Sequence, residues 1–454
     1  TWAGDNDPVH PFNWSASRKW TNVVLISLQA TLSPIASTIL AIGANAIASD
    51  FHLTDAYTPA LPTGLYVLGL GLGPLLLAPC SEIYGRRIVY LVSIAVFTVL
   101  NVGCALSPNI TALSILRLAS GVAGSVGPSL GAGSIGDMFR AEERGKAQSV
   151  YSFGPVMGPV LGGVMGGYIV DRTHGWAWLM WVIAIASGAT VVVSIFLLRE
   201  TYAPYLLSRN QRLEAGDIGV APAKDLFSRA ITRPIRLLFT SPICAFMSIY
   251  LSLIYGILYL HLITILLLFG PTELYGLYSY HWQNGNTGLA YLGAGIGSVI
   301  GMVITGKLMN RSFASGLARQ ERQTGSSVPT PELRLPFLQL GTFVVPVGLI
   351  VFAWSAGRTH WIVPLLGACI FGAGMLMAYV CIHTYLVDCF GRWSASALAA
   401  AVVTRCIITS AFCIIGFELY RKLGYDWGSM LLAFLCIAMI PVPFLLKKYG
   451  PRLR

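Results

Sequence analysis

The 454-residue sequence has few charged residues. Asp, Glu, Lys and Arg make up 11% of the chain, whereas 55% of its residues are apolar. A soluble globular protein carries about 25% charged residues. This chain therefore cannot cover a water-facing surface, which excludes a secreted enzyme, a cytosolic domain pair and a disordered scaffold.

The sequence also lacks the usual signatures of a metal or disulfide framework. Its nine cysteines form no Cys-x-x-Cys pair and no cluster with histidine, and most of them lie in apolar runs. Free cysteine behaves as a small, often buried apolar residue. We therefore expect buried thiols, no disulfides, no metal site and no cofactor.

The chain instead has apolar runs long enough to cross a bilayer, which takes roughly 20 residues per helix. Six runs precede a polar, basic stretch and six follow it, which predicts an all-α integral membrane protein with twelve transmembrane helices in two bundles. The expected spans lie near 21–43, 60–80, 88–106, 111–134, 147–170, 177–198, 243–269, 286–309, 337–355, 361–383, 395–418 and 427–446.

The same pattern divides the chain into five expected parts. These are a cytoplasmic N-terminal segment (1–20), an N-terminal six-helix bundle (21–198), a cytoplasmic basic connector (199–242), a C-terminal six-helix bundle (243–446) and a cytoplasmic tail (447–454).

The positive charge is distributed unevenly along this arrangement. The 30 Lys and Arg exceed the 19 Asp and Glu and give a formal net charge of +11. With a cytoplasmic N-terminus, 24 of the 30 basic residues fall in the predicted inside loops and tails, and Arg172, Arg358, Arg421 and Lys422 fall outside. Basic residues accumulate in cytoplasmic loops. The charge therefore predicts that both termini are cytoplasmic, and it gives no reason to expect nucleic-acid binding.

The loop between the second and third spans reads Ala78-Pro79-Cys80-Ser81-Glu82-Ile83-Tyr84-Gly85-Arg86-Arg87. Glu82 can cap the following helix, and Arg86 and Arg87 can pair with acids of neighbouring loops. We expect a latch that closes one conformation, with Asp388 at the inner end of the tenth span as a second gating acid. The alternative is a basic anchor at the membrane surface.

The fifth span has a face rich in glycine and proline. Three glycines, four residues apart, fall near one side of the helix, and two prolines interrupt its hydrogen-bond ladder. This face can press against another helix and can kink; packing without a functional role is the alternative. The residues are Gly154, Pro155, Gly158, Pro159, Gly162 and Gly163.

Two arginines lie inside predicted spans, Arg117 in the fourth and Arg405 in the eleventh. A charge at mid-helix costs roughly 2.5–3.5 kcal/mol on insertion scales. We therefore expect each to face a wet cavity or a partner group, with snorkelling to the interface as the alternative.

In this order and at these spans, the loop, the span-four arginine and the glycine–proline face resemble the hallmark motifs of the major facilitator superfamily. With Asp7-Pro8-x-x-Pro11-x-x-Trp14 at the start and Arg199-Glu200-Thr201 after the sixth span, the chain is similar to fungal twelve-helix drug:proton antiporters from about residue 5 to 446. The resemblance implies two pseudo-symmetric bundles that alternate access around a site near the bilayer midplane. It also implies proton coupling through Arg117, and a plasma-membrane location with the vacuolar membrane as the alternative.

The candidate cargo site combines aromatic, titratable and basic side chains of the second bundle. The residues are Tyr250, Tyr255, Tyr259, His261, Tyr379, His383 and Arg405. Core packing is the alternative for the aromatic and histidine side chains. An apolar aromatic cavity suits an amphiphilic drug or secondary metabolite, whereas arginine and histidine without a central acid suit an organic acid.

The sequence thus predicts a secondary active transporter and not an enzyme. We expect a monomer, embedded in membrane lipid, that exports a drug, toxin, secondary metabolite or organic acid in exchange for protons. An exporter specific for a small carboxylate and a non-transporting membrane sensor of the same fold are the alternatives.

Overall fold

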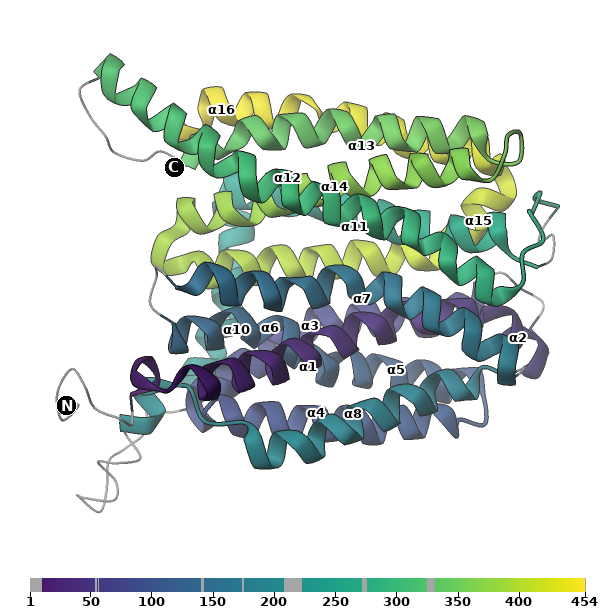
Figure 1. Cartoon of the computed structure of the whole chain (residues 1–454), viewed down its shortest axis with the longest axis horizontal. Helices are drawn as coiled ribbons and strands as arrows, with labels where there is room; N and C mark the ends of the chain where they lie inside the picture. The colour runs from purple at the N-terminus through teal and green to yellow at the C-terminus, as the bar shows by residue number, and fades with distance from the viewer. Residues whose placement is uncertain are drawn as a thin grey trace. The chain divides into compact units, whose positions relative to one another are not determined.

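The structure, a computed structural model, describes residues 10–53, 55, 57–139, 143–173, 175–207, 223–271, 276–324 and 331–453. All regular secondary structure in these ranges is helical (Figure 1). The chain divides into two compact units, Thr1–Thr232 and Arg233–Arg454, so the boundary falls inside the predicted connector. Among the described residues, eleven helical segments are long and apolar enough to cross a membrane.

The first unit contains the first six of these segments. The fourth is built from two helices that meet at Ser125, and the Asn109 side chain caps its start by accepting a hydrogen bond from the Ala112 N–H at 2.8 Å. The elements are η1 (Pro11–Asn13), α1 (Ala16–Ile42), α2 (Ala44–Asp50), η2 (Thr58–Ala60), α3 (Leu61–Tyr84), α4 (Arg86–Ala105), α5 (Ile110–Gly124), α6 (Val126–Met138), α7 (Arg144–Thr173) and α8 (Ala177–Leu197), followed by α10 (Ala223–Thr240), which crosses into the second unit.

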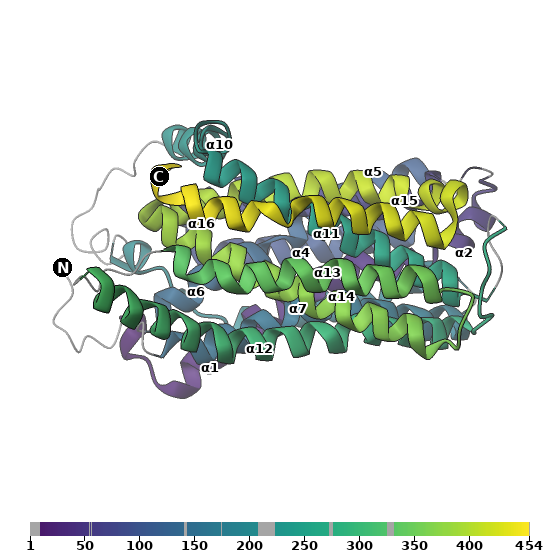
Figure 2. The ribbon, with the colours of Figure 1, turned by 90° about the horizontal axis from the view of Figure 1, so that it is seen from above.

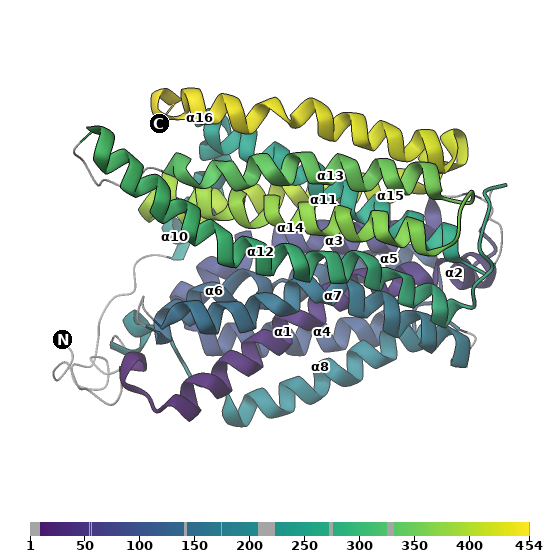
Figure 3. The same ribbon diagram turned by 45° about the horizontal axis from the view of Figure 1, so that its top comes forward.

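The second unit continues with α11 (Pro242–Phe269), α12 (Asn284–Thr324), η3 (Pro331–Arg334), α13 (Leu335–Ser355), α14 (Ile362–Phe390), η4 (Gly391–Trp393), α15 (Ser394–Met439) and α16 (Pro441–Leu453). Gly424 interrupts α15 with φ 69° and ψ 179°, a conformation that glycine adopts without a steric penalty. In Figures 1 and 3 the last part of α15 (yellow) returns along the bundle into α16. Counting its two halves separately gives twelve crossings, which confirms the predicted fold class.

Glycine allows the helices of the first unit to approach closely. A Cβ at Gly158 on α7 would lie 2.5 Å from the Cβ of Pro34 on α1, and one at Gly162 would lie 2.4 Å from Oγ1 of Thr38. The Thr38 hydroxyl donates a hydrogen bond to the carbonyl of Pro159 at 2.9 Å. The glycine face of the fifth span therefore lies against the first span, and α7 remains helical through both of its prolines.

The second unit uses the same device. A Cβ at Gly297 on α12 would lie 1.9 Å from the carbonyl oxygen of Cys369 on α14, and one at Gly348 on α13 would lie 2.3 Å from the backbone nitrogen of Phe371 on α14. In a bilayer, small residues stabilise helix pairs by letting their backbones pack. In each unit, glycine thus sets which helix faces meet.

This packing predicts a large difference between two Gly→Ala substitutions of the first unit. We expect Gly158→Ala to destabilise the protein by about 1–3 kcal/mol, because overpacking forces α1 and α7 apart. Gly188→Ala on α8 is the matched control, since its Cβ would lie 3.5 Å from the Thr98 methyl group, an ordinary contact. The melting temperatures of both purified variants are measured by heating each one and detecting the remaining folded protein by size-exclusion chromatography. Equal melting temperatures for the two variants would contradict the packing argument.

Candidate functional site

Arg117 on α5 is fully buried in the first unit, where three spans hold its charge. Its guanidinium carbon lies 4.0 Å from the ring centroid of Tyr66 on α3, and its Nη2 donates a hydrogen bond to the carbonyl of Ala36 on α1 at 2.6 Å. The Tyr66 hydroxyl is fixed in turn by Ser33, whose carbonyl accepts a hydrogen bond from it at 3.0 Å. Arg117 therefore has partner groups inside the unit and does not snorkel.

The local sequence explains how Tyr66 comes to face Arg117. Gly121 lies one turn after Arg117 on α5, and a Cβ there would lie 2.2 Å from the carbonyl oxygen of Tyr66. The two helix backbones therefore touch at this level. That contact brings the aromatic face and the guanidinium together in the way that a cation–π interaction requires.

The loop between α3 and α4 is organised by an acid that the sequence analysis did not select. Gly85 has φ 86°, and Glu200, which follows α8, accepts hydrogen bonds from the N–H groups of Arg86 and Arg87 at 2.9 and 3.0 Å. The prediction that Glu82 caps this helix is wrong. The Glu82 side chain is exposed and forms no ion pair within the described part of the chain.

The two arginines of this loop have different partners. Arg86 forms an ion pair with Asp137 at the end of α6 at 3.3 Å and donates to the Ser81 hydroxyl at 2.7 Å. The Arg87 side chain donates to the carbonyl of Ile195 at 2.9 Å, and none of the ion pairs among the described residues includes it. The Arg86 guanidinium also lies 5.0 Å from the ring centroid of Tyr202, and burial together with the nearby Glu82 raises the pKa of this phenol.

Asp388, the other predicted gating acid, lies at the end of α14 in the second unit. It forms an ion pair with Arg334, which precedes α13. Each unit therefore has an arginine–aspartate pair at helix ends predicted to be cytoplasmic. Arg334 was not among the residues predicted from the sequence.

The second unit brings four of the predicted cargo residues together. The guanidinium carbon of Arg405 on α15 lies 4.2 Å from the ring centroid of Tyr255 on α11, and the Tyr255 ring lies 5.5 Å from that of Tyr379 on α14. The rings of Tyr379 and His383 are 4.2 Å apart. Arg405 is half-buried, and none of the ion pairs among the described residues includes it. These four residues are called the Arg405 cluster below.

His261 does not join this cluster. Its imidazole is fully buried against Phe352 on α13 and Phe371 on α14, at ring-centroid distances of 4.5 and 4.9 Å. Neither ring nitrogen has a hydrogen-bond partner among the described residues. The structure thus supports the packing alternative for His261. Tyr259 is also buried, one turn along α11 from Tyr255.

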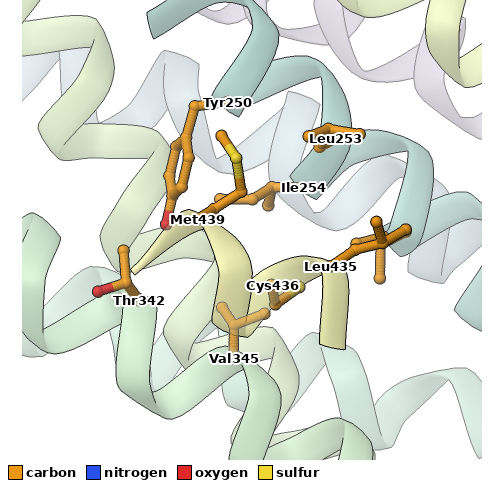
Figure 4. Close-up of a pocket in the computed structure, with 9 residues that line it drawn as sticks. Tyr250, Leu253, Ile254, Thr342, Val345, Leu435, Cys436 and Met439 are labelled. Carbon is orange, nitrogen blue, oxygen red and sulfur yellow. The ribbon is translucent and has the colours of Figure 1, made fainter. Parts of the chain in front are cut away.

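A separate pocket lies in the second unit between α11, α13 and α15 (Figure 4). Its lining is mostly aliphatic and includes Cys436 and Met439, while Tyr250 and Thr342 contribute hydroxyl groups. No member of the Arg405 cluster lines it, and it offers no charged side chain to a ligand. Of the predicted cargo residues, only Tyr250 belongs to this pocket.

Known proteins with similar sequences are membrane transporters. The family model described as "Major Facilitator Superfamily" matches residues 26–413. The chain is 39% identical to the MFS transporter cpaT of Aspergillus oryzae over 100% of this chain and 91% of that protein. It is 38% identical to the efflux pump radE of Floropilus chiversii over 100% of this chain and 84% of that protein.

Solved structures show the same fold at lower sequence identity. The proton:xylose symporter XylE bound to 6-bromo-6-deoxy-D-glucose matches with a TM-score of 0.66 and 16% identity over 96% of both chains. A POT family transporter in complex with 5-aminolevulinic acid matches with a TM-score of 0.63 and 11% identity over 95% of this chain and 96% of that one. The chain belongs to the major facilitator superfamily and is a membrane transporter, not an enzyme.

Proposed function

We propose that the chain exports a small organic acid by proton-coupled antiport with alternating access. The observation that carries this proposal is the Arg405 cluster, in which a half-buried guanidinium has an aromatic partner and no ion-paired acid among the described residues. A cation in a membrane span is retained where it serves a cavity or a pathway. An anionic group of the cargo would supply the negative charge that no ion-paired acid in the described part of the chain provides to the Arg405 guanidinium.

The geometry of the cluster suits a carboxylate. Tyr255 lies against one face of the guanidinium, and the N–H donors of an arginine point outward in the plane of that group. The side chain of Cys406 is hydrogen-bonded to this group, and the donors that it leaves can form a bidentate bond to a carboxylate. The Nε2 atom of His383, which is buried without a hydrogen-bond partner among the described residues, is a second polar group within the cluster.

Antiport and export are supported by the sequence resemblance. The glycine–proline face of α7 matches the motif associated with antiporters, and one relative is named an efflux pump. From the distribution of basic residues we propose that both termini are cytoplasmic. The family likeness favours the plasma membrane over the vacuolar membrane.

Arg117 is our candidate for proton coupling. An arginine side chain remains charged in a protein, so Arg117 cannot itself release the transported proton. Its guanidinium can shift the proton affinity of neighbouring water or side chains, and its bond to the Ala36 carbonyl ties it to α1, which packs against the glycine face of α7. A change at Arg117 can therefore reach the face proposed to move.

The arginine–aspartate pairs are proposed to gate the cytoplasmic ends of the helices. Arg86 and Asp137 join the start of α4 to the end of α6, and Arg334 and Asp388 join the start of α13 to the end of α14. Breaking such a pair costs little when water reaches the charges. Each pair can therefore hold one conformation closed and still open during the transport cycle.

The cargo proposal is tested by replacing Arg405. We expect Arg405→Ala to lower dicarboxylate transport into proteoliposomes with an imposed pH gradient by about 10- to 100-fold, because hydrogen bonds to charged groups contribute about 1.5–3 kcal/mol. Transport of an amphiphilic cation by the same variant should be unaffected.

Arg358→Ala is the matched control for this experiment. Arg358 belongs to the same unit and also lies over an aromatic ring, 5.1 Å from the centroid of Trp354, but it is ion-paired with Asp426. Dicarboxylate transport should survive this change. Equal dicarboxylate transport by wild type and Arg405→Ala would refute the role of Arg405, and failure of both cargoes to respond to the pH gradient would refute proton antiport of these cargo classes.

If Arg117 couples protons to cargo, a substitution there should affect accumulation driven by a pH gradient but not cargo counterflow. We expect Arg117→Gln to abolish accumulation driven by a pH gradient while cargo counterflow without a gradient continues, because the charge next to the proton path is lost and the Arg405 cluster is intact. Tyr66→Phe is the control, since it keeps the ring beside Arg117 and removes only the hydroxyl bonded to Ser33. Wild-type accumulation by Arg117→Gln would exclude a coupling role, and counterflow confirms that each variant is folded.

A further inference from the structure

The last two turns of α10 present three different faces. Side chains on a helix are displaced by about 100° per residue. Pro234, Leu237 and Leu238 fall on one side, Ile235 and Phe239 on a second, and Arg233 and Arg236 on a third. Only the first side is turned into the second unit: Leu237 and Leu238 pack against a buried cluster of Cys244, Ala397 and Ala400.

The side chains on the other two faces are exposed. Phe239 is 82% exposed and Ile235 is 49% exposed, while the side chains of Arg233 and Arg236 are both exposed. An aqueous surface explains exposed arginines but not a nearly bare phenylalanine next to them. A membrane surface explains both, because its hydrocarbon accepts the apolar face and its headgroups accept the basic one.

The direction of α10 fits that environment. The helix stands upright in Figure 1, where α11 runs along the picture, and it is seen close to end-on in Figure 2. It therefore crosses the direction of the span that follows it. Only Ser241 separates Thr240 from Pro242, where α11 begins, and Phe246 and Ile249 in the first turns of α11 are also exposed. The amphipathic segment thus lies where a spanning helix enters the bilayer.

A second element of the unit adds an aromatic anchor to the basic face. The guanidinium carbon of Arg233 lies 4.7 Å from the ring centroid of Trp393, which belongs to η4 between α14 and α15 and is 41% exposed. Tryptophan is enriched at headgroup depth, where its ring is partly apolar and its N–H is a donor. The planar group of Arg233 is therefore held in place with its donors free for phosphate oxygens.

We propose that Arg233, Arg236 and Trp393 form a binding site for the headgroups of anionic phospholipids, with Ile235 and Phe239 inserted among the acyl chains beside them. The site is independent of cargo and proton binding, because it lies on the exposed side of α10 and shares no residue with the Arg405 cluster. It recognises the phosphate and the net negative charge of the lipid in the leaflet where α10 lies.

The test measures lipid selectivity with the full chain reconstituted in phosphatidylcholine vesicles. The motionally restricted fraction of spin-labelled phosphatidylserine is compared with that of spin-labelled phosphatidylcholine. We expect wild type to prefer phosphatidylserine and R233Q/R236Q to lose this preference, since each basic side chain near an anionic surface contributes about fivefold in affinity. R233K/R236K should keep most of it.

The control variant R421Q/K422Q also removes two positive charges from the unit, at side chains that both pair with Glu418. This variant should keep the preference for phosphatidylserine. For wild type, raising the salt concentration should weaken the preference, whereas inorganic phosphate at matched ionic strength should not abolish it. Equal selectivity in wild type and R233Q/R236Q overturns the proposal. If R233Q/R236Q fails to fold, a wild-type preference for phosphatidylserine that does not change with salt overturns the proposal. Displacement of the labelled phosphatidylserine by inorganic phosphate also overturns it and assigns the site to free phosphate.

Discussion

In a lipid bilayer the hydrophobic effect does not drive helices together, so the structure depends on how closely two helix backbones can approach. Lipid is as apolar as leucine, so helix pairs are stabilised by packing and hydrogen bonds, not by release of water. Glycine supplies the necessary closeness between α1 and α7, between α3 and α5, and between α12 and α14. The contact at Gly121 also brings Tyr66 onto Arg117, so the same constraint that packs the unit accommodates its buried charge.

Much of the fold could be read from the sequence because its signals are local. The length of an apolar run predicts a span, and an excess of basic residues predicts a side of the membrane. Partners at long range could not be read in this way. Glu200 caps α4 from more than a hundred residues away, and Arg334 pairs with Asp388 across two helices. Both depend on which helix ends meet, which no local pattern encodes.

The same limit explains why the structure brings only some of the predicted cargo residues together. Nearly every side chain of α11 from Tyr250 to Phe269 is buried or half-buried, so the helix has no polar face that orients it in advance. Tyr255 and His261 are six residues apart, or about 240° around the helix. One therefore reaches Arg405 while the other packs between Phe352 and Phe371.

The two intramembrane arginines look alike in the sequence and differ in what surrounds them. Arg117 is fully buried, and a ring and a peptide carbonyl from two other helices already bind it. Arg405 is half-buried and has its ring partner on one face. A fully buried cation that is held by internal partners can influence those neighbours, whereas a half-buried cation can still be reached by an incoming anion. This difference in burial, more than the presence of charge, is the reason that we propose coupling for one arginine and cargo binding for the other.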